Sequence, residues 1–139
     1  MAARMKIKLV QTGPVKFVAR NAAGAIGVID GPTDQGGENA GLRPMETLLF
    51  ALAGCSSLDV LHIMKKQRQH LERLEVEVDG ERLDAVPAVF KRIHLRFKGY
   101  GQIDIKRFQK AIDLSMEKYC SVSRMLEPKV TITAEGVIG

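Results

Sequence analysis

The sequence predicts an α+β fold in which an antiparallel, curved sheet packs on two principal helices. Segments in which polar and apolar residues alternate recur on both sides of a long helical segment, and such alternation is typical of half-buried strands. The helical segment runs from Pro44 to about Gln69, and a second helical stripe begins near residue 105. The resulting order, β-β-β-α-β-β-α-β with short connections between neighbouring strands, favours antiparallel pairing.

Three strands are expected before the long helix. They are predicted over residues 5–11, 15–20 and 25–30, where apolar side chains alternate with polar ones or fall between turn signals. Residues 31–41, GPTDQGGENAG, are rich in glycine and show no periodicity. They predict a loop that is long enough to be functional.

The long helix is expected to lie at the centre of the fold. Pro44 suits a first helical position, and only Gly54 interrupts the helix-forming residues that follow. Apolar residues occupy most of the helix circumference, which is typical of a buried helix rather than a surface one. Such a helix on a curved sheet would expose much apolar surface in a monomer, so a homodimer is expected.

The second half of the chain predicts three more strands and a second helix. The strands are expected over residues 71–79, 90–98 and 129–137. Asp104 is a candidate cap for the second helix, which has an apolar stripe and ends near Tyr119. Residues 121–126 predict a short further turn of helix before Pro128.

Length and composition favour one soluble domain over residues 1–139. The net charge of +5 is scattered, and aromatic residues make up only 5% of the chain, which argues against a nucleic-acid surface. The N-terminal segment has no apolar core of signal-peptide length, and the longest apolar run, residues 47–53, is too short to span a membrane. We therefore expect a cytoplasmic protein, in which two cysteines would not normally form a permanent bridge.

The two cysteines are the candidate reactive groups. Cys55 follows Gly54 inside the long helix. A glycine in a helix interior lowers helix stability by about 1 kcal/mol relative to alanine, so its presence suggests that another group approaches the helix closely there. Cys120 follows the second helix, and if it caps the next one, the helix dipole would favour its thiolate, with Arg124 as a possible nearby charge. From composition alone, two buried, inert thiols are the favoured interpretation. The cysteines form no CxxC motif and show no zinc spacing with the histidines, so neither a metal nor a bound cofactor is expected.

Asp59 and His62 lie four and seven positions after Cys55, so the three side chains can share one helix face. His62 would then be placed to exchange a proton with the thiol, and Asp59 to orient it. The interpretation we favour is structural, with both residues making interhelical or subunit contacts.

Two motifs resemble those of the OsmC-like family, which includes the OsmC and Ohr organic hydroperoxide resistance proteins. Residues 43–55, RPMETLLFALAGC, are similar to its first cysteine motif in a branch that reads Pro-x-Glu, and residues 119–123, YCSVS, to its second. The resemblance covers nearly the whole chain and implies an intertwined homodimer with active sites at the interface. It also implies thiol peroxidase activity on organic hydroperoxides and often on hydrogen peroxide. Cys55 would be the peroxidatic residue, Cys120 the resolving residue, and an external thiol or dithiol the reductant.

The sequence departs from the family pattern around the expected activating residues. The family glutamate usually follows the proline directly, whereas Glu46 comes one position later and falls on the side of an ideal helix opposite Cys55. Either the helix begins after Glu46 or this residue makes a different contact. Arg20 is the first candidate for the family's arginine and Arg43 the second, and Ser121 replaces a common proline.

Two other functions remain open from the sequence. A protein with this fold can bind or process a small molecule other than a peroxide, and the changed glutamate position is compatible with that. A basic, non-enzymatic binding protein, for example for RNA, is the other alternative.

Overall fold

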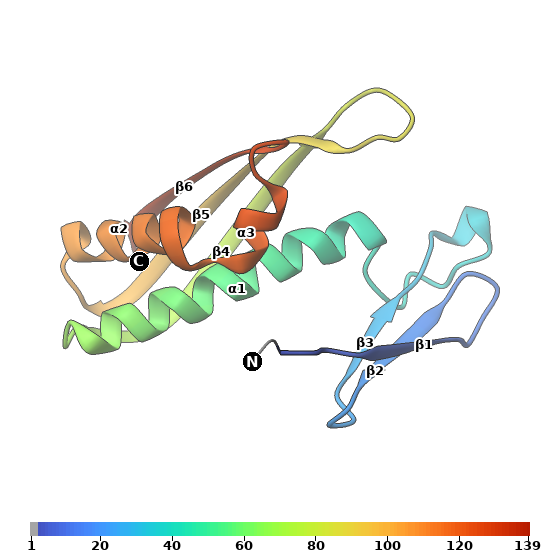
Figure 1. Ribbon diagram of the computed structural model, residues 1–139, viewed down its shortest axis with the longest axis horizontal. Helices are drawn as coiled ribbons and strands as arrows, with labels where there is room; N and C mark the ends of the chain where they lie inside the picture. The colour runs from blue at the N-terminus through green and yellow to red at the C-terminus, as the bar shows by residue number, and fades with distance from the viewer. Residues whose placement is uncertain (1–2) are drawn as a thin grey trace. The chain divides into compact units, whose positions relative to one another are not determined.

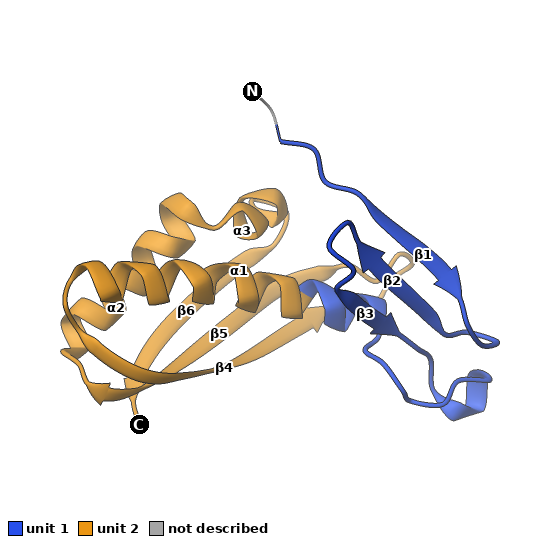
Figure 2. Cartoon of the chain, turned by 90° about the horizontal axis from the view of Figure 1, so that it is seen from below, with its two compact units in different colours: residues 1–48 blue, residues 49–139 orange. Residues whose placement is uncertain are grey.

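The structure, a computed structural model, describes residues 3–139, and its chain divides into two compact units. Figure 2 distinguishes residues 1–48 from residues 49–139, and each unit is described by itself. The predicted α+β class and the order of the predicted elements are confirmed, but the strands form two three-stranded sheets rather than one. The expectation of a single domain over residues 1–139 stays a prediction.

The N-terminal unit contains an antiparallel sheet in the order β1-β2-β3. Its strands are β1 (Ile7–Gln11), β2 (Phe17–Asn21) and β3 (Ile26–Ile29). The turn between β2 and β3 contains Gly24 at a φ of 87°, a left-handed conformation that glycine adopts without a Cβ clash. The Asn21 side chain accepts hydrogen bonds from the N–H groups of Ala23 and Ala25 and so closes this turn.

The glycine-rich loop after β3 is held by a buried aspartate. Asp30 accepts hydrogen bonds from the N–H groups of Gly31, Glu38 and Ala40 at 2.7, 3.0 and 3.1 Å. Burial acts to raise the pKa of Asp30, but these donors outweigh it and hold the pKa below its usual value. The loop, which includes the short 3₁₀ helix η1 (Thr33–Gln35), is therefore fixed by the side chain that precedes it.

Helix α1 spans Pro44–Lys66 and begins at the predicted residue. One stripe of α1, spaced by four residues, is fully buried; it consists of Leu52, Ser56, Val60 and Met64. The Ser56 hydroxyl donates to the Leu52 carbonyl at 2.8 Å, which satisfies the polar member of the stripe. The helix ends before Gln69 because Arg68 turns into the left-handed region at a φ of 56°.

The C-terminal unit contains a mixed sheet in the order β4-β5-β6. Its strands are β4 (His70–Arg82), β5 (Phe90–Gln102) and β6 (Thr131–Ile138). β4 and β5 form the expected antiparallel hairpin, whereas β6 runs parallel to β5, so the expected antiparallel pairing does not extend to this last strand. The connection between β5 and β6 contains helices, and a helical crossover returns the chain in the same direction as the strand that it left.

Alternation along β5 shows that the helices cover one face of this sheet (Figure 1). Its inward residues are buried, namely Ile93, Leu95 and Phe97, whereas Arg92, His94 and Arg96 between them are exposed. β5 extends past Lys98, where the sequence predicted its end. Gly99 stays in the strand, and a Cβ there would lie 2.7 Å from Ile103 Cδ1 and 3.0 Å from Phe108 Cζ. The glycine therefore lets α2 approach the sheet.

Three consecutive helical segments form the crossover. They are α2 (Ile105–Leu114), a π-helical turn η2 (Ser115–Tyr119) and α3 (Ser121–Leu126). Asp104 caps α2 as predicted, and its side chain accepts from the Arg107 N–H at 3.1 Å. The sequence predicted one helix to Tyr119, but its last turn widens into η2, a feature that is frequent at functional sites.

Candidate functional site: a dithiol beside a cavity

The structure brings the two cysteines together within the C-terminal unit. Cys55 lies on α1 and Cys120 lies at the start of α3, and both are free thiols. The two Sγ atoms and a carboxylate oxygen of Asp59 all lie within 4.8 Å of one another. A disulfide requires sulfur atoms about 2.05 Å apart, so a shift of a few ångströms joins the two thiols.

Cys120 caps α3, as the sequence suggested. Its Sγ accepts a hydrogen bond from the Ser123 N–H at 3.4 Å, which is the expected capping contact. Arg124 is not among the groups that shift the pKa of Cys120, and its guanidinium donates to the Glu117 carbonyl at 2.8 Å. The capping geometry is thus confirmed, and its electrostatic consequence can be read from the pKa of the thiol.

Capping by itself favours a Cys120 thiolate, as expected, but it does not determine the net pKa of the thiol. Burial raises the pKa of the Cys120 thiol to about 11, and the neighbouring Cys55 sulfur adds to the increase. The Ser123 N–H acts in the opposite direction but is outweighed, because loss of solvation disfavours the charged form more than one long hydrogen bond favours it. Cys120 is therefore a protonated thiol at neutral pH.

Asp59 joins the helix of Cys55 to the π-helical turn that precedes Cys120. Its carboxylate accepts a hydrogen bond from the Ser115 hydroxyl at 2.8 Å, and Ser115 is fully buried. The Cys120 N–H donates to the Ser115 carbonyl at 2.7 Å, so one residue holds both the aspartate and the backbone of the second cysteine. The structural interpretation of Asp59 as an interhelical contact is confirmed, and the same contact places its charge beside both sulfurs.

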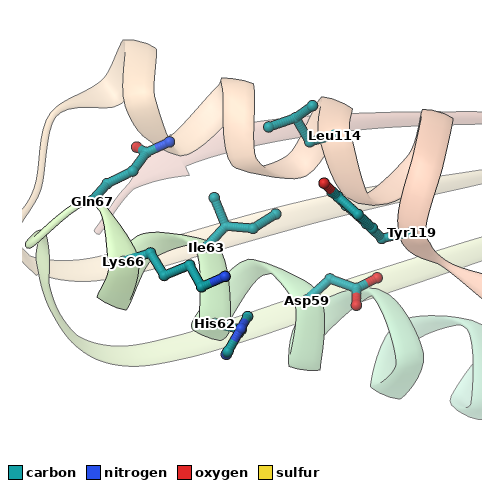
Figure 3. A pocket seen from close by; sticks show the side chains of 7 residues that line it. All are labelled: Asp59, His62, Ile63, Lys66, Gln67, Leu114 and Tyr119. Carbon is teal, nitrogen blue, oxygen red and sulfur yellow. The ribbon is translucent and has the colours of Figure 1, made fainter.

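A cavity of about 490 Å³ adjoins the dithiol and shares Asp59 with it. The cavity lies between α1 and the segment of α2 and η2, and it is lined by Asp59, His62, Ile63, Lys66, Gln67, Leu114 and Tyr119 (Figure 3). In Figure 3, the Ile63 side chain and the Tyr119 hydroxyl point toward Leu114, and the Tyr119 hydroxyl points away from the Asp59 carboxylate. The His62 ring points away from Leu114 and Tyr119. The cavity thus combines an apolar wall with a carboxylate at the end that adjoins the thiols.

Gly54 was expected to mark a close approach. A Cβ at this position would meet nothing within 4 Å among the described residues, so the chain itself does not fill the space. Exposed apolar side chains surround it on α1, namely Phe50, Leu58 and Leu61. Residues at these spacings share one helix face with Gly54, and this apolar face of α1 is left uncovered.

The other predicted site residues belong to the N-terminal unit, so their part in the site stays a prediction. Glu46 lies within α1 and its carboxylate accepts from the Arg43 N–H at 2.8 Å, which caps the helix start. The different-contact alternative for Glu46 is therefore the one that the structure supports. The Arg43 guanidinium donates to the carbonyl of Asp30 and to the side chain of Asn39, and Arg20 is exposed on β2.

Ser115 and Tyr119 are site residues that the sequence did not single out. A serine or tyrosine near a helix end carries no distinctive signal, and the π-helical turn that presents both has no sequence signature. Lys66, a basic residue in the last turn of α1, also lines the cavity.

The chain belongs to the OsmC-like protein family, whose sequence model matches residues 36–135. It is 41% identical over 119 residues to Protein YhfA of Escherichia coli K12, an alignment that covers 84% of this chain and 85% of that protein. The family that the resemblance indicated is thereby confirmed, whereas the branch with a Pro-x-Glu motif stays a prediction.

Solved structures share the fold over nearly the whole chain. A hypothetical protein from Aquifex aeolicus VF5 superposes with a TM-score of 0.87 at 28% identity and covers 99% of this chain and 98% of its own. An organic hydroperoxide resistance protein OsmC from Legionella pneumophila gives a TM-score of 0.72 at 16% identity, with 98% of both chains covered. OhrB of Bacillus subtilis, also an organic hydroperoxide resistance protein, gives 0.67 at 17% identity, with 97% and 98% covered.

Helix α1 is the one segment among the described residues that is long and apolar enough to cross a membrane, by length and composition alone. Polar residues interrupt the apolar ones along this helix, so uninterrupted apolar runs in the sequence do not indicate it. The fully buried stripe of this helix is typical of a core helix, and core helices pass the same test of length and composition.

Proposed function

We propose that this protein is a thiol-dependent peroxidase that reduces organic hydroperoxides, with hydrogen peroxide as a second substrate. The observation that carries the proposal is the convergence of Cys55 and Cys120, 65 positions apart in the sequence, beside a cavity with an apolar wall. Membership of the OsmC-like family supports it, as do neighbours of the same fold that are described as organic hydroperoxide resistance proteins.

The two thiols supply the two electrons of the reaction. The Cys55 thiolate attacks one oxygen of the O–O bond, the alkoxide leaves and takes a proton to become an alcohol, and Cys55 becomes a sulfenic acid. The Cys120 sulfur then attacks the sulfenic sulfur, and the hydroxyl leaves with the Cys120 proton as water. The product is a Cys55–Cys120 disulfide, which an external thiol or dithiol reduces by exchange.

The roles of the two cysteines follow from their surroundings. Cys55 is partly exposed, whereas Cys120 is buried and has a pKa of about 11. The thiolate is the nucleophile in peroxide attack, so the buried and protonated thiol is poorly suited to the first step. It is suited to the second, because its proton leaves with the sulfenic hydroxyl.

An arginine and a glutamate are expected to assist the first step. Between the two candidates, Arg20 is favoured because it is exposed, whereas the Arg43 guanidinium already binds two groups of its own unit. Glu46 keeps the predicted role only if it leaves its capping contact with the Arg43 N–H. These assignments rest on the family pattern.

The proposed enzyme is a cytoplasmic homodimer. The apolar face of α1 around Gly54 lies one residue from Cys55, and burying it against a second copy would place the site at the interface. A partner surface there would also shield the reacting sulfur from water.

Trapping of the sulfenic acid tests the proposal. The Cys120→Ser variant, treated with one equivalent of cumene hydroperoxide and then dimedone, is expected to carry one dimedone adduct on Cys55. The Cys55→Ser variant serves as the matched control and is expected to carry none. If both variants stay unmodified while Cys55 of the wild type reacts readily with an alkylating agent, the site handles a non-peroxide electrophile.

A further inference from the structure

Three atoms that can coordinate a metal ion converge at the dithiol. They are Cys55 Sγ, Cys120 Sγ and a carboxylate oxygen of Asp59, all within 4.8 Å of one another. We propose that the reduced protein binds a divalent ion of the zinc class at this place, through these three side chains. The proposal does not depend on the peroxidase reaction, because it concerns the protein before any oxidation.

The spacing of the three atoms fits a tetrahedral site. Zinc binds thiolate sulfur at about 2.3 Å, which places two sulfur ligands roughly 3.8 Å apart in a tetrahedron. The three atoms already lie within 4.8 Å of one another, so they need to close by about an ångström or less. Sequence spacing could not reveal this site, because the ligands come from two elements that are far apart in the chain.

Neighbouring groups hold the ligands in place, as they do in established metal sites. The Asp59 carboxylate is oriented by the Ser115 hydroxyl at 2.8 Å, and the Cys120 sulfur faces the Ser123 N–H at 3.4 Å. Ser115 is fully buried, so its hydroxyl has little access to water as an alternative partner. Cys55 and Asp59 are four residues apart on α1 and therefore present their ligand atoms on the same helix face.

Three protein ligands leave a fourth coordination position open, as in catalytic rather than structural zinc sites. Asp59 also lines the cavity, so water or a small ligand can reach the metal from that side. Both sulfurs bind the metal as thiolates, so the Cys120 thiol releases its proton to solvent on binding.

Metal binding and disulfide formation exclude each other, because both use the same two sulfurs. Oxidation of the metal-bound pair by a hydroperoxide consumes two protons and yields the disulfide, one alcohol, one water and the free metal ion. The metal-bound state is therefore expected to protect the thiols from alkylation, and oxidation is expected to release the metal.

Zinc binding to tag-free, reduced protein tests the proposal. Competition with a chromophoric chelator is expected to give one Zn²⁺ per chain, and Co²⁺ in its place is expected to give sulfur-to-cobalt charge-transfer absorption. Cys55→Ser and Cys120→Ser each are expected to weaken binding by more than 100-fold and to reduce the cobalt band. Ser115→Ala, which removes the support of Asp59, is expected to weaken it by about 10–100-fold.

Matched controls separate this site from surface binding. Asp59→Asn is expected to weaken zinc binding, whereas Asp113→Asn on the exposed side of α2 leaves it unchanged, and circular dichroism checks that every variant is folded. Equal binding by reduced and disulfide-oxidised protein, or full binding by Asp59→Asn, would overturn the proposal. Peroxide consumption is measured separately on metal-free protein, so a failure of the proposed peroxidase reaction is distinguished from a failure of metal binding.

Discussion

At the scale of single residues, two opposing effects act on the pKa of the Cys120 thiol. A helix N-terminus and a capping N–H favour a thiolate, whereas removal from water favours the neutral thiol. At Cys120 the capping contact is long and α3 is only six residues, while the side chain is buried. Burial dominates, which makes Cys120 suited to resolve a sulfenic acid rather than to attack a peroxide.

The raised pKa of Cys120 predicts a pH-dependent stability. Folding keeps the thiol protonated up to a pKa of about 11, whereas the unfolded thiol ionises near its ordinary value of 9.0. This contribution to stability is complete below pH 9 and is lost as the pH rises toward 11, because the unfolded chain releases its proton first. Urea unfolding of the reduced wild type and of Cys120→Ser over this pH range measures this contribution. The free energy of unfolding of the wild type is expected to fall relative to that of the variant as the pH increases. A constant difference between the two proteins would show that burial does not raise this pKa.

At the scale of secondary-structure elements, the π-helical turn η2 is what assembles the site. It presents Ser115 toward Asp59 and Tyr119 toward the cavity, and its backbone positions Cys120. A regular α-helix through residues 115–119 would rotate these groups relative to one another. The position of η2 next to the second cysteine is consistent with the general association of π-helical turns with functional sites.

Ser115→Ala is predicted to loosen the contact between α1 and η2. The variant loses a hydrogen bond from a buried hydroxyl to a carboxylate that is partly exposed, which is expected to lower the free energy of unfolding by about 1–2 kcal/mol. Ser121→Ala, on an exposed side chain of α3, is the matched control and is expected to change little. Chemical denaturation measures the stability of both variants. Equal stabilities would show that the hydrogen bond from Ser115 to Asp59 does not stabilise the contact between α1 and η2.

The sequence predicted correctly those features that depend only on residues close together in the chain. The alternation on β5 and the cap at Asp104 are confirmed because both depend on neighbouring residues in the chain. The parallel pairing of β6, the extension of β5 through Gly99 and the turn η2 depend on contacts between distant segments, which periodicity does not show. Within the site, the cysteine motifs suggested the pair, whereas Ser115 became visible only in three dimensions.

At the scale of the whole molecule, the uncovered apolar face of α1 bears on the proposed dimer. Phe50, Leu58 and Leu61 are exposed on this helix, although its opposite stripe is fully buried. Gly54 lies among them with open space above it, and a glycine there allows another surface to approach the helix closely. A helix that is apolar on both sides is expected to be covered on both sides in the functional protein.

Gly54→Arg is predicted to convert a dimer into monomers. The single chain accommodates a side chain at this position, since a Cβ meets nothing within 4 Å, but a charge on this face would oppose burial against a second copy. Analytical ultracentrifugation is expected to show a dimer for the wild type and for the control Gln102→Arg, and a monomer for Gly54→Arg. A monomeric wild type, or a Gly54→Arg variant that stays dimeric, would contradict the proposed interface.

The most direct test of the central claim is a titration of anaerobically reduced, metal-free protein with cumene hydroperoxide, followed by thiol counting and intact mass. One equivalent is expected to consume both thiols and to lower the mass by two hydrogens, faster than hydrogen peroxide does, and the single thiol of Cys55→Ser is expected to survive. Both thiols of the wild type surviving a large excess of hydroperoxide would contradict the claim that Cys55 and Cys120 form a peroxidase dithiol.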